Sequence, residues 1–183
     1  EQVLKNNKLN NIPPENIKDK IGNLLIFSQD NEIEKLFLEY YSQLLYGYKI
    51  LPTSNVKSVL ASEIKGEYMG QSSINANKII DEAMGGILHI EKIQDLITET
   101  FDFNGKDAFN TIIGRMVGDA EKFILFFSGE EDKMSEFLQN DFFYVKNKFL
   151  EPINIVKIFN ESIKTEDLEK EETEEDIIKE LNL

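Results

Sequence analysis

The sequence predicts an α/β fold, with a parallel sheet covered by helices on both faces. Short apolar runs, which suit buried strands, alternate along the chain with segments whose apolar residues recur at helical spacing. This strand–helix alternation repeats four times and is typical of a parallel sheet with helical crossovers. Such sheets bind ligands at the carboxyl ends of their strands, so we expect the functional residues in the loops after Phe27, Ile90 and Phe127.

The first strand and the first helix have the clearest patterns. Residues 24–27 read Leu-Leu-Ile-Phe, a short apolar run typical of a buried strand. Asp30 and Asn31 are suitable N-cap residues for a helix. Residues 32–47 follow with apolar side chains at the i, i+3, i+4, i+7 spacing of an amphipathic helix. We therefore predict a strand, a capped turn and a long helix here.

The remaining elements are predicted on the same grounds. Further strands are expected around residues 56–61, 87–90 and 123–127. The sequence Gly85-Gly86 ends one of the helices, because glycine readily adopts the left-handed conformation that closes a helix. Helices are predicted over residues 72–83, 106–119, 130–139, 142–148 and 154–164.

Composition excludes several classes of function. Of the 183 residues, 41% are hydrophobic, which is enough for a core. There is no apolar run long enough to span a membrane, and there is no cysteine for a disulfide or a thiolate metal site. The net charge of −14 argues against a nucleic-acid partner, because phosphate binding needs clustered Lys and Arg. We expect a cytoplasmic protein that contacts neither nucleic acid nor membrane.

The charge divides the chain into parts. Residues 161–183 hold ten acidic and three basic side chains, so this tail carries half of the net charge. We predict a lead-in segment over residues 1–21, a core domain over 22–160, and an acidic, partly helical tail over 161–183. The chain starts with Glu1 and not Met, which indicates a piece of a longer protein.

The central part of the chain resembles a known family. Residues 66–96 read GEYMGQSSINANKIIDEAMGGILHIEKIQDL and resemble the AAA+ ATPases of the CbxX/CfxQ family, which includes the stage V sporulation protein K group. Residues 102–116 (DFNGKDAFNTIIGRM) and 123–138 (FILFFSGEEDKMSEFL) also resemble segments of that family. The resemblance implies an AAA+ P-loop NTPase-like core over residues 22–160, with the family's helical lid absent or truncated.

The phosphate-binding loop of the family is altered in this chain. The family reads G-x-P-G-T-G-K-T where residues 29–36 read QDNEIEKL, so Lys35 falls on the P-loop lysine and every glycine is lost. The glycines let backbone N–H groups wrap around phosphates. Glu32 and Glu34 add negative charge where a polyphosphate would lie, and Leu36 replaces the hydroxyl that would bind Mg²⁺.

Two further catalytic motifs also depart from the family. Glu91 and Lys92 stand where the family has the Walker B Asp-Glu pair, and an ordinary lysine is no base at neutral pH. The arginine finger, R-x-R-F in the family, corresponds to residues 146–149, where Lys146 and Lys148 lack the planar guanidinium fork. The only arginine, Arg115, aligns inside the helix after Walker B.

Other catalytic chemistry finds little support in the sequence. His89 lies in a predicted buried strand with no second His and no Cys nearby, so we expect a hydrogen-bonded core residue and no metal site. There is no G-x-S-x-G motif of a serine hydrolase.

We predict a catalytically degenerate AAA+ ATPase-like domain, without turnover of its own, that has a structural or regulatory role in a ring or tandem assembly with active AAA+ domains. The expected partners are other AAA+ subunits or domains, as a homo- or hetero-oligomer, and a protein client. We expect no cofactor at the vestigial Walker positions Lys35 and Glu91, and Lys146 and Lys148 are the finger-equivalent positions. Two alternatives stay open: an active ATPase that binds ATP and Mg²⁺ through Lys35 and Glu91, and a stand-alone interaction scaffold.

Overall fold

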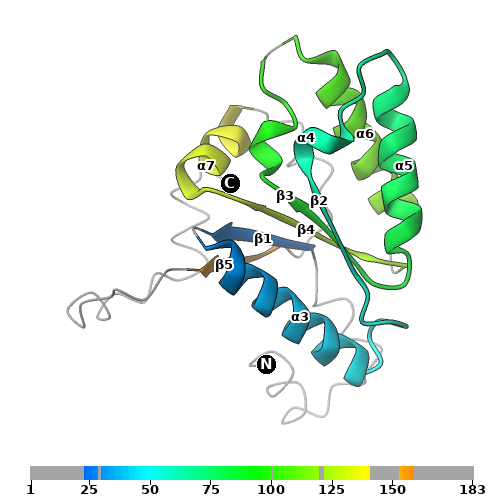
Figure 1. Cartoon of the computed structure of the whole chain (residues 1–183), viewed down its shortest axis with the longest axis vertical. Helices are drawn as coiled ribbons and strands as arrows, with labels where there is room; N and C mark the ends of the chain where they lie inside the picture. Colours follow the sequence, from blue (N-terminus) through cyan, green and yellow to red (C-terminus); the bar gives the residue numbers. More distant parts are fainter. Residues whose placement is uncertain (1–22, 29, 100, 120–121, 141–152, 159–183) are drawn as a thin grey trace, which may run out of the picture.

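A computed structural model describes residues 23–28, 30–99, 101–119, 122–140 and 153–158. These residues form a five-stranded sheet with the strand order β2-β3-β4-β1-β5, in which every neighbouring pair is parallel (Figure 1). The predicted α/β class with a parallel sheet is confirmed. The strands are β1 (Asn23–Ser28), β2 (Val56–Leu60), β3 (Ile87–Glu91), β4 (Ile124–Gly129) and β5 (Ile153–Ile158).

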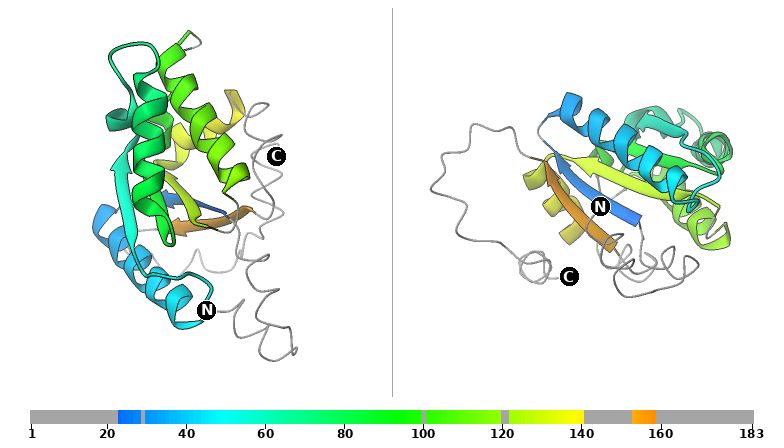
Figure 2. Two further views of the ribbon diagram at one scale, coloured as in Figure 1. Left: turned by 90° about the vertical axis from the view of Figure 1, so that its right-hand side faces the viewer. Right: turned by 90° about the horizontal axis from the view of Figure 1, so that it is seen from below.

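Helices cover both faces of this sheet, as predicted (Figure 2). One face packs against α3, and the opposite face packs against α5, α6 and α7. The short helix α4 and the 3₁₀ turn η1 connect strands to the longer helices. The bounds are α3 (Asn31–Gly47), α4 (Ala61–Ile64), α5 (Gln71–Ala83), η1 (Ile93–Asp95), α6 (Phe103–Gly118) and α7 (Glu131–Asn140).

Two hydrophobic cores lie on the two faces because successive strand residues point to opposite sides. Leu24 and Ile26 of β1 face α3, where Leu38 and Leu45 are buried. The intervening Leu25 and Phe27 face the α5, α6 and α7 side, in the larger core. Strands buried on both faces have continuous apolar runs, which explains why residues 24–27 were recognisable from the sequence.

The C-terminal part of the described chain differs from the prediction. Residues 154–164 were predicted to be helical, but residues 153–158 form β5, which pairs with β1 from Asn23↔Ile153 to Ser28↔Ile158. The helix prediction is therefore wrong over these residues. Four of the six residues of β5 are β-branched, which favours a strand, and β5 satisfies backbone groups of β1 that the sheet would otherwise leave unpaired.

Several predicted segments lie outside the described residues. They are the lead-in segment over 1–21, the helix over 142–148 and the acidic tail over 161–183. The predicted absence or truncation of the lid also concerns this part of the chain and stays a prediction. Among the described residues, no helix combines the length and apolar character needed to cross a bilayer.

Candidate functional site

The candidate site is the connection between β1 and α3, at the carboxyl end of the central strands. Strand β1 ends at Ser28 and helix α3 begins at Asn31, so only residues 29 and 30 lie between them. Residues 31–36, which include Lys35, the predicted P-loop lysine position, form the first turns of α3. A glycine-rich phosphate loop has more residues between its strand and its helix. The chain therefore has a tight turn between β1 and α3.

Asp30 caps this helix, as the sequence predicted. Its Oδ1 accepts hydrogen bonds from the backbone N–H groups of Glu32, at 2.9 Å, and Ile33, at 3.1 Å. The Ser28 hydroxyl braces the turn by donating to the Asp30 carbonyl oxygen at 3.1 Å. Free N–H groups at a helix N-terminus are the groups that bind phosphate in P-loop proteins. Here the chain's own carboxylate occupies two of them.

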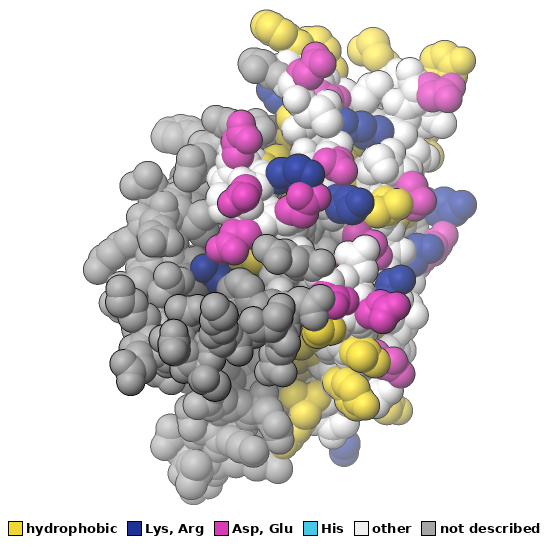
Figure 3. All heavy atoms as spheres, turned by 60° about the vertical axis from the view of Figure 1, so that its left-hand side comes forward, with side chains coloured by type: hydrophobic (Ala, Val, Ile, Leu, Met, Phe, Trp, Pro, Cys, Tyr) yellow, Lys and Arg dark blue, Asp and Glu magenta, His cyan; other side chains and the backbone are white. Residues whose placement is uncertain are grey.

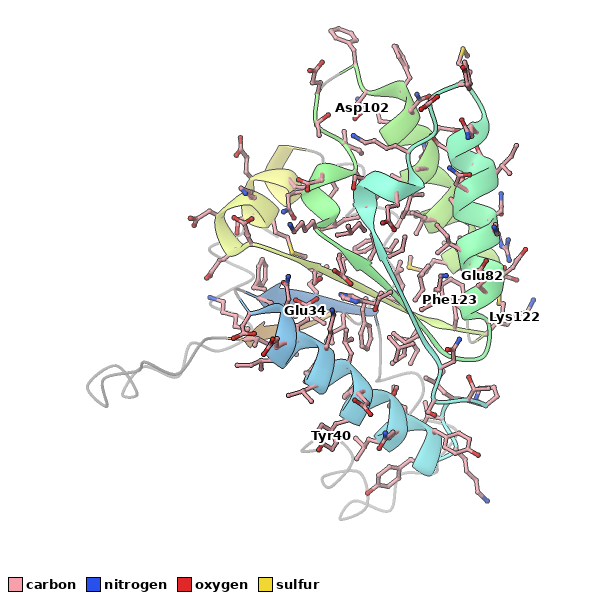
Figure 4. The ribbon with its side chains drawn as sticks, viewed as in Figure 1. Glu34, Tyr40, Glu82, Asp102, Lys122 and Phe123 are labelled. Carbon is pink, nitrogen blue, oxygen red and sulfur yellow. The ribbon has the colours of Figure 1, made fainter. Side chains whose placement is uncertain are left out.

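Glu34 lies in the first turn of α3 and turns toward the sheet, with 8% of its side chain exposed (Figure 4). Its Oε1 accepts a hydrogen bond from the Ser128 hydroxyl at 2.7 Å and lies 2.9 Å from Nε2 of His89. Burial raises the pKa of Glu34, but the hydrogen bonds from His89, Ser128 and Ser28 outweigh burial and lower the pKa below its ordinary value. A second carboxylate therefore lies ionised just behind the helix end.

His89 is a hydrogen-bonded core residue, as predicted, with only 1% of its surface exposed. Its Nε2 lies 2.8 Å from the Ser128 hydroxyl oxygen, and its Nδ1 lies 3.0 Å from the Ser58 hydroxyl oxygen. Side chains from α3, β2, β3 and β4 thus meet in one polar cluster, formed by the buried Glu34, His89 and Ser128 and the exposed Ser58. Among the described residues, there is no group of three or more His, Cys, Asp or Glu side chains that could hold a metal ion.

The two vestigial Walker positions lie in different surroundings. Lys35 is exposed on α3 and lines a groove beside β2, whereas Glu91 is half-buried at the end of β3. Within the described part of the chain, no hydrogen bond or ion pair joins Lys35 to Glu91. The finger-equivalent Lys146 and Lys148 lie outside the described residues. Binding by these four residues therefore stays a prediction.

The only arginine joins two helices. Arg115 of α6 forms ion pairs with Asp81 of α5 at 2.8 Å and with Asp119 at 2.5 Å, and it donates to the Asn77 side chain at 2.8 Å. The hydrogen bonds to Asp81 and Asp119 raise the pKa of the guanidinium. These contacts give Arg115 a structural role between α5 and α6.

Sequence reasoning missed an exposed apolar cluster at one end of the molecule. Figure 3 shows hydrophobic side chains gathered at its top, at the end where α5 and α6 begin. Met69 has 95% of its surface exposed, and its four companions are also largely exposed. An amphipathicity analysis assigns such residues to a core by default, because it does not show which helix ends project from the fold. The apical apolar cluster consists of Tyr68, Met69, Ile74, Phe101 and Phe103.

Comparison with known proteins finds distant relatives. No family model matches the chain. The chain is similar to the ESX-1 secretion system protein EccA1 of Mycobacterium tuberculosis (strain ATCC 25618 / H37Rv), with 25% identity over 103 residues, which are 55% of this chain and 18% of EccA1. It is also similar to the ESX-3 secretion system protein EccA3 of the same strain, with 25% identity over 96 residues, 52% of this chain and 15% of EccA3. The match thus spans less than a fifth of these relatives.

Among solved structures, the chain is similar to the FIGL-1 AAA domain in complex with ADP. The TM-score is 0.46 at 10% sequence identity, and the match covers 78% of this chain and 44% of that one. The similarity to the EccA proteins supports a distant relationship to AAA+ ATPases. It does not single out the CbxX/CfxQ branch.

Proposed function

We propose that this chain is an AAA+ ATPase-like domain of the CbxX/CfxQ type that does not turn over ATP and acts as a structural or regulatory part of an assembly. The observation that carries the proposal is the Asp30 carboxylate, which accepts hydrogen bonds from the first free N–H groups of α3. A phosphate would have to displace this carboxylate, at the cost of the N-cap.

Charge around the same turn supports the proposal. Glu32 is exposed beside the cap, and the ionised Glu34 lies behind it. A like-charge contact at about 4 Å costs on the order of 1–4 kcal/mol between water-like and surface dielectric values. Lys35 is an exposed cation one turn into the same helix. The balance at this helix end therefore disfavours a polyphosphate and its Mg²⁺.

A role in an assembly is supported by the apical apolar cluster. Large apolar side chains exposed at one end of a folded domain are typical of protein interaction sites. The relatives EccA1 and EccA3 are named as secretion system proteins, which favours a place in a multi-component machine. The partners that fit are other AAA+ subunits or domains and a protein client. We propose that the cluster contacts one of them.

Turnover and mass in solution test this function. Phosphate release from Mg-ATP by the wild-type chain should equal that of Lys35→Ala and Glu91→Gln variants, at the level of buffer alone. Release that is lost in either variant would establish the active ATPase alternative. Sedimentation should show association with an AAA+ domain that has intact motifs. A strict monomer in that mixture would favour the stand-alone scaffold.

A further inference from the structure

A continuous hydrogen-bonded line of side chains runs from a surface groove into the interior beneath α3. Ser58 Oγ on β2 lies 3.0 Å from His89 Nδ1 on β3, and His89 Nε2 lies 2.9 Å from Glu34 Oε1 on α3. Burial increases along this line: Ser58 is exposed, whereas His89 and Glu34 are 1% and 6% exposed. The line therefore has one end that a ligand can reach.

The Glu34 carboxylate, at the buried end of this line, determines which ring nitrogen of a neutral His89 carries the proton. An ionised carboxylate only accepts hydrogen bonds, so the N–H group of a neutral His89 is Nε2, which faces Glu34. The Ser128 hydroxyl donates to the same carboxylate and accepts from Nε2, which agrees with this tautomer. Nδ1 is then the basic nitrogen, and the Ser58 hydroxyl donates to it.

This order of groups is that of a nucleophile, its general base and a carboxylate that orients the base. The carboxylate stabilises the imidazolium that forms when Nδ1 takes the hydroxyl proton. Among the described contacts of His89, the only charged or titratable partner is Glu34 of α3. The other two partners are the hydroxyls of Ser58 on β2 and Ser128 on β4.

Ser58 lines a groove of about 410 Å³ between α3 and β2, a size that suits a small ligand. Lys35 and Glu39 line the same groove, so it carries one cation and one carboxylate. Leu38 and Val56 give the groove an apolar part. A small carboxylic ester matches this combination: an apolar acyl chain, a carbonyl carbon open to attack, and a carbonyl oxygen that becomes negative during attack.

We propose that Ser58, His89 and Glu34 form an esterase-like acyl-transfer site, independent of any nucleotide site. Ser58 Oγ forms a bond to the ester carbonyl carbon while its proton passes to His89 Nδ1. The bond from that carbon to the alcohol oxygen breaks, and His89 returns the proton to the leaving alcohol. Water then attacks the acyl carbon with the same base, which releases the carboxylic acid and restores Ser58. Glu34 is a positioning residue.

Covalent labelling tests the proposal. The wild-type chain is treated with an alkyl fluorophosphonate probe, and the product is mapped by intact mass and peptide mass spectrometry. One adduct on Ser58 is expected. It should be lost in Ser58→Ala, a change at an exposed position whose folding is checked by circular dichroism, and retained in Ser54→Ala, which changes another serine of the same groove. No adduct, or an adduct that persists in Ser58→Ala, would overturn the proposal.

The labelling rate of Glu34 variants separates positioning from structure. Glu34→Gln removes the charge and keeps the shape, so the imidazolium that forms during attack loses its neighbouring carboxylate. The labelling rate should fall about 100-fold, and Glu34→Asp, which restores the carboxylate, should recover part of it. Circular dichroism checks that both variants are folded. An unchanged rate in folded Glu34→Gln would show that Glu34 has no part in the chemistry and would overturn the relay.

Discussion

At the residue scale, the chain uses its own carboxylates where a P-loop protein binds phosphate. Asp30 accepts from the first N–H groups of α3, and Glu34 is held by His89 and Ser128 behind them. The N-cap was visible in the sequence. The burial of Glu34 had a weaker signal: it lies four residues before the buried Leu38, on the same face of the helix.

Removing the cap should destabilise the protein. In Asp30→Ala, two N–H groups of α3 lose their acceptor, and we expect the free energy of unfolding to fall by about 1 kcal/mol. Urea denaturation of wild type and variant measures the difference. Asp30→Ser, which keeps a capping oxygen, should lie close to wild type. Equal stability of Asp30→Ala and wild type would show that the cap does not hold this turn.

A second residue makes stability depend on pH. Asp102 caps α6 at the apical end (Figure 4) and pairs with Lys65 at 2.7 Å. Burial raises the pKa of Asp102, but hydrogen bonds from Lys65 and from the N–H groups of Gly105 and Thr98 outweigh it and lower the pKa from 3.8 to about 2. The ionised form therefore favours the folded state. This contribution is complete above about pH 4 and is lost as pH falls through about 2.

We expect Asp102→Asn to lower the free energy of unfolding by about 2 kcal/mol at neutral pH. The pKa of Asp102 is lower in the folded than in the unfolded chain, so its ionised form stabilises the folded state at this pH. The difference in the free energy of unfolding between Asp102→Asn and wild type should become smaller as the pH is lowered toward about 2. Urea denaturation across this pH range measures it. Asp132→Asn, at an exposed position of α7, is the control and should show no gap. A gap that does not depend on pH would contradict the ionic explanation.

At the element scale, helices and central strands were predictable, and the edge of the sheet was not. Residues 32–47 show a full helical period, and α3 is found over Asn31–Gly47. Strand β5 has only six residues, too few to separate a strand from a helix by periodicity, and its pairing partner β1 lies more than a hundred residues away in the chain. The Ser58–His89 contact depends on the β2–β3 register, which no local pattern specifies.

The pairing of α5 with α6 through Arg115 gives a further prediction. Arg115→Met keeps the aliphatic bulk and removes three charged or polar contacts, so we expect a loss of about 1–2 kcal/mol in the free energy of unfolding. Thermal or urea denaturation measures it. The control is Lys122→Met, which removes a more exposed partner of Asp119 and should change stability little. If both variants behave alike, the inter-helix contacts of Arg115 contribute nothing.

At the scale of the whole molecule, an α/β domain with a parallel sheet combines a carboxylate-capped helix start after β1 with an exposed apolar end. The order of elements predicted a parallel sheet with two helical layers, because crossover helices between parallel strands leave few other solutions. The strand order β2-β3-β4-β1-β5 did not follow from that alternation. The apical apolar cluster arises from which helix ends project, and this depends on the assembled fold.

Substitutions in the apical apolar cluster should weaken association with a partner and leave the stability of the fold unchanged. Replacing Met69 and Phe103 together by Ser removes large apolar surface that the fold does not bury. The free energy of unfolding should stay near wild type, while binding to an AAA+ partner measured by sedimentation should weaken at least about tenfold, as expected for an interface centre. Unchanged binding would show that the partner docks elsewhere.

The central claim is that the N-terminus of α3 is closed to nucleotide by Asp30 and Glu34. Isothermal titration calorimetry of Mg-ATP into the folded wild-type chain tests it most directly, because it detects binding without requiring turnover. We predict no saturable heat of binding up to millimolar nucleotide. Saturable binding at micromolar nucleotide, with one site per chain, would contradict the account.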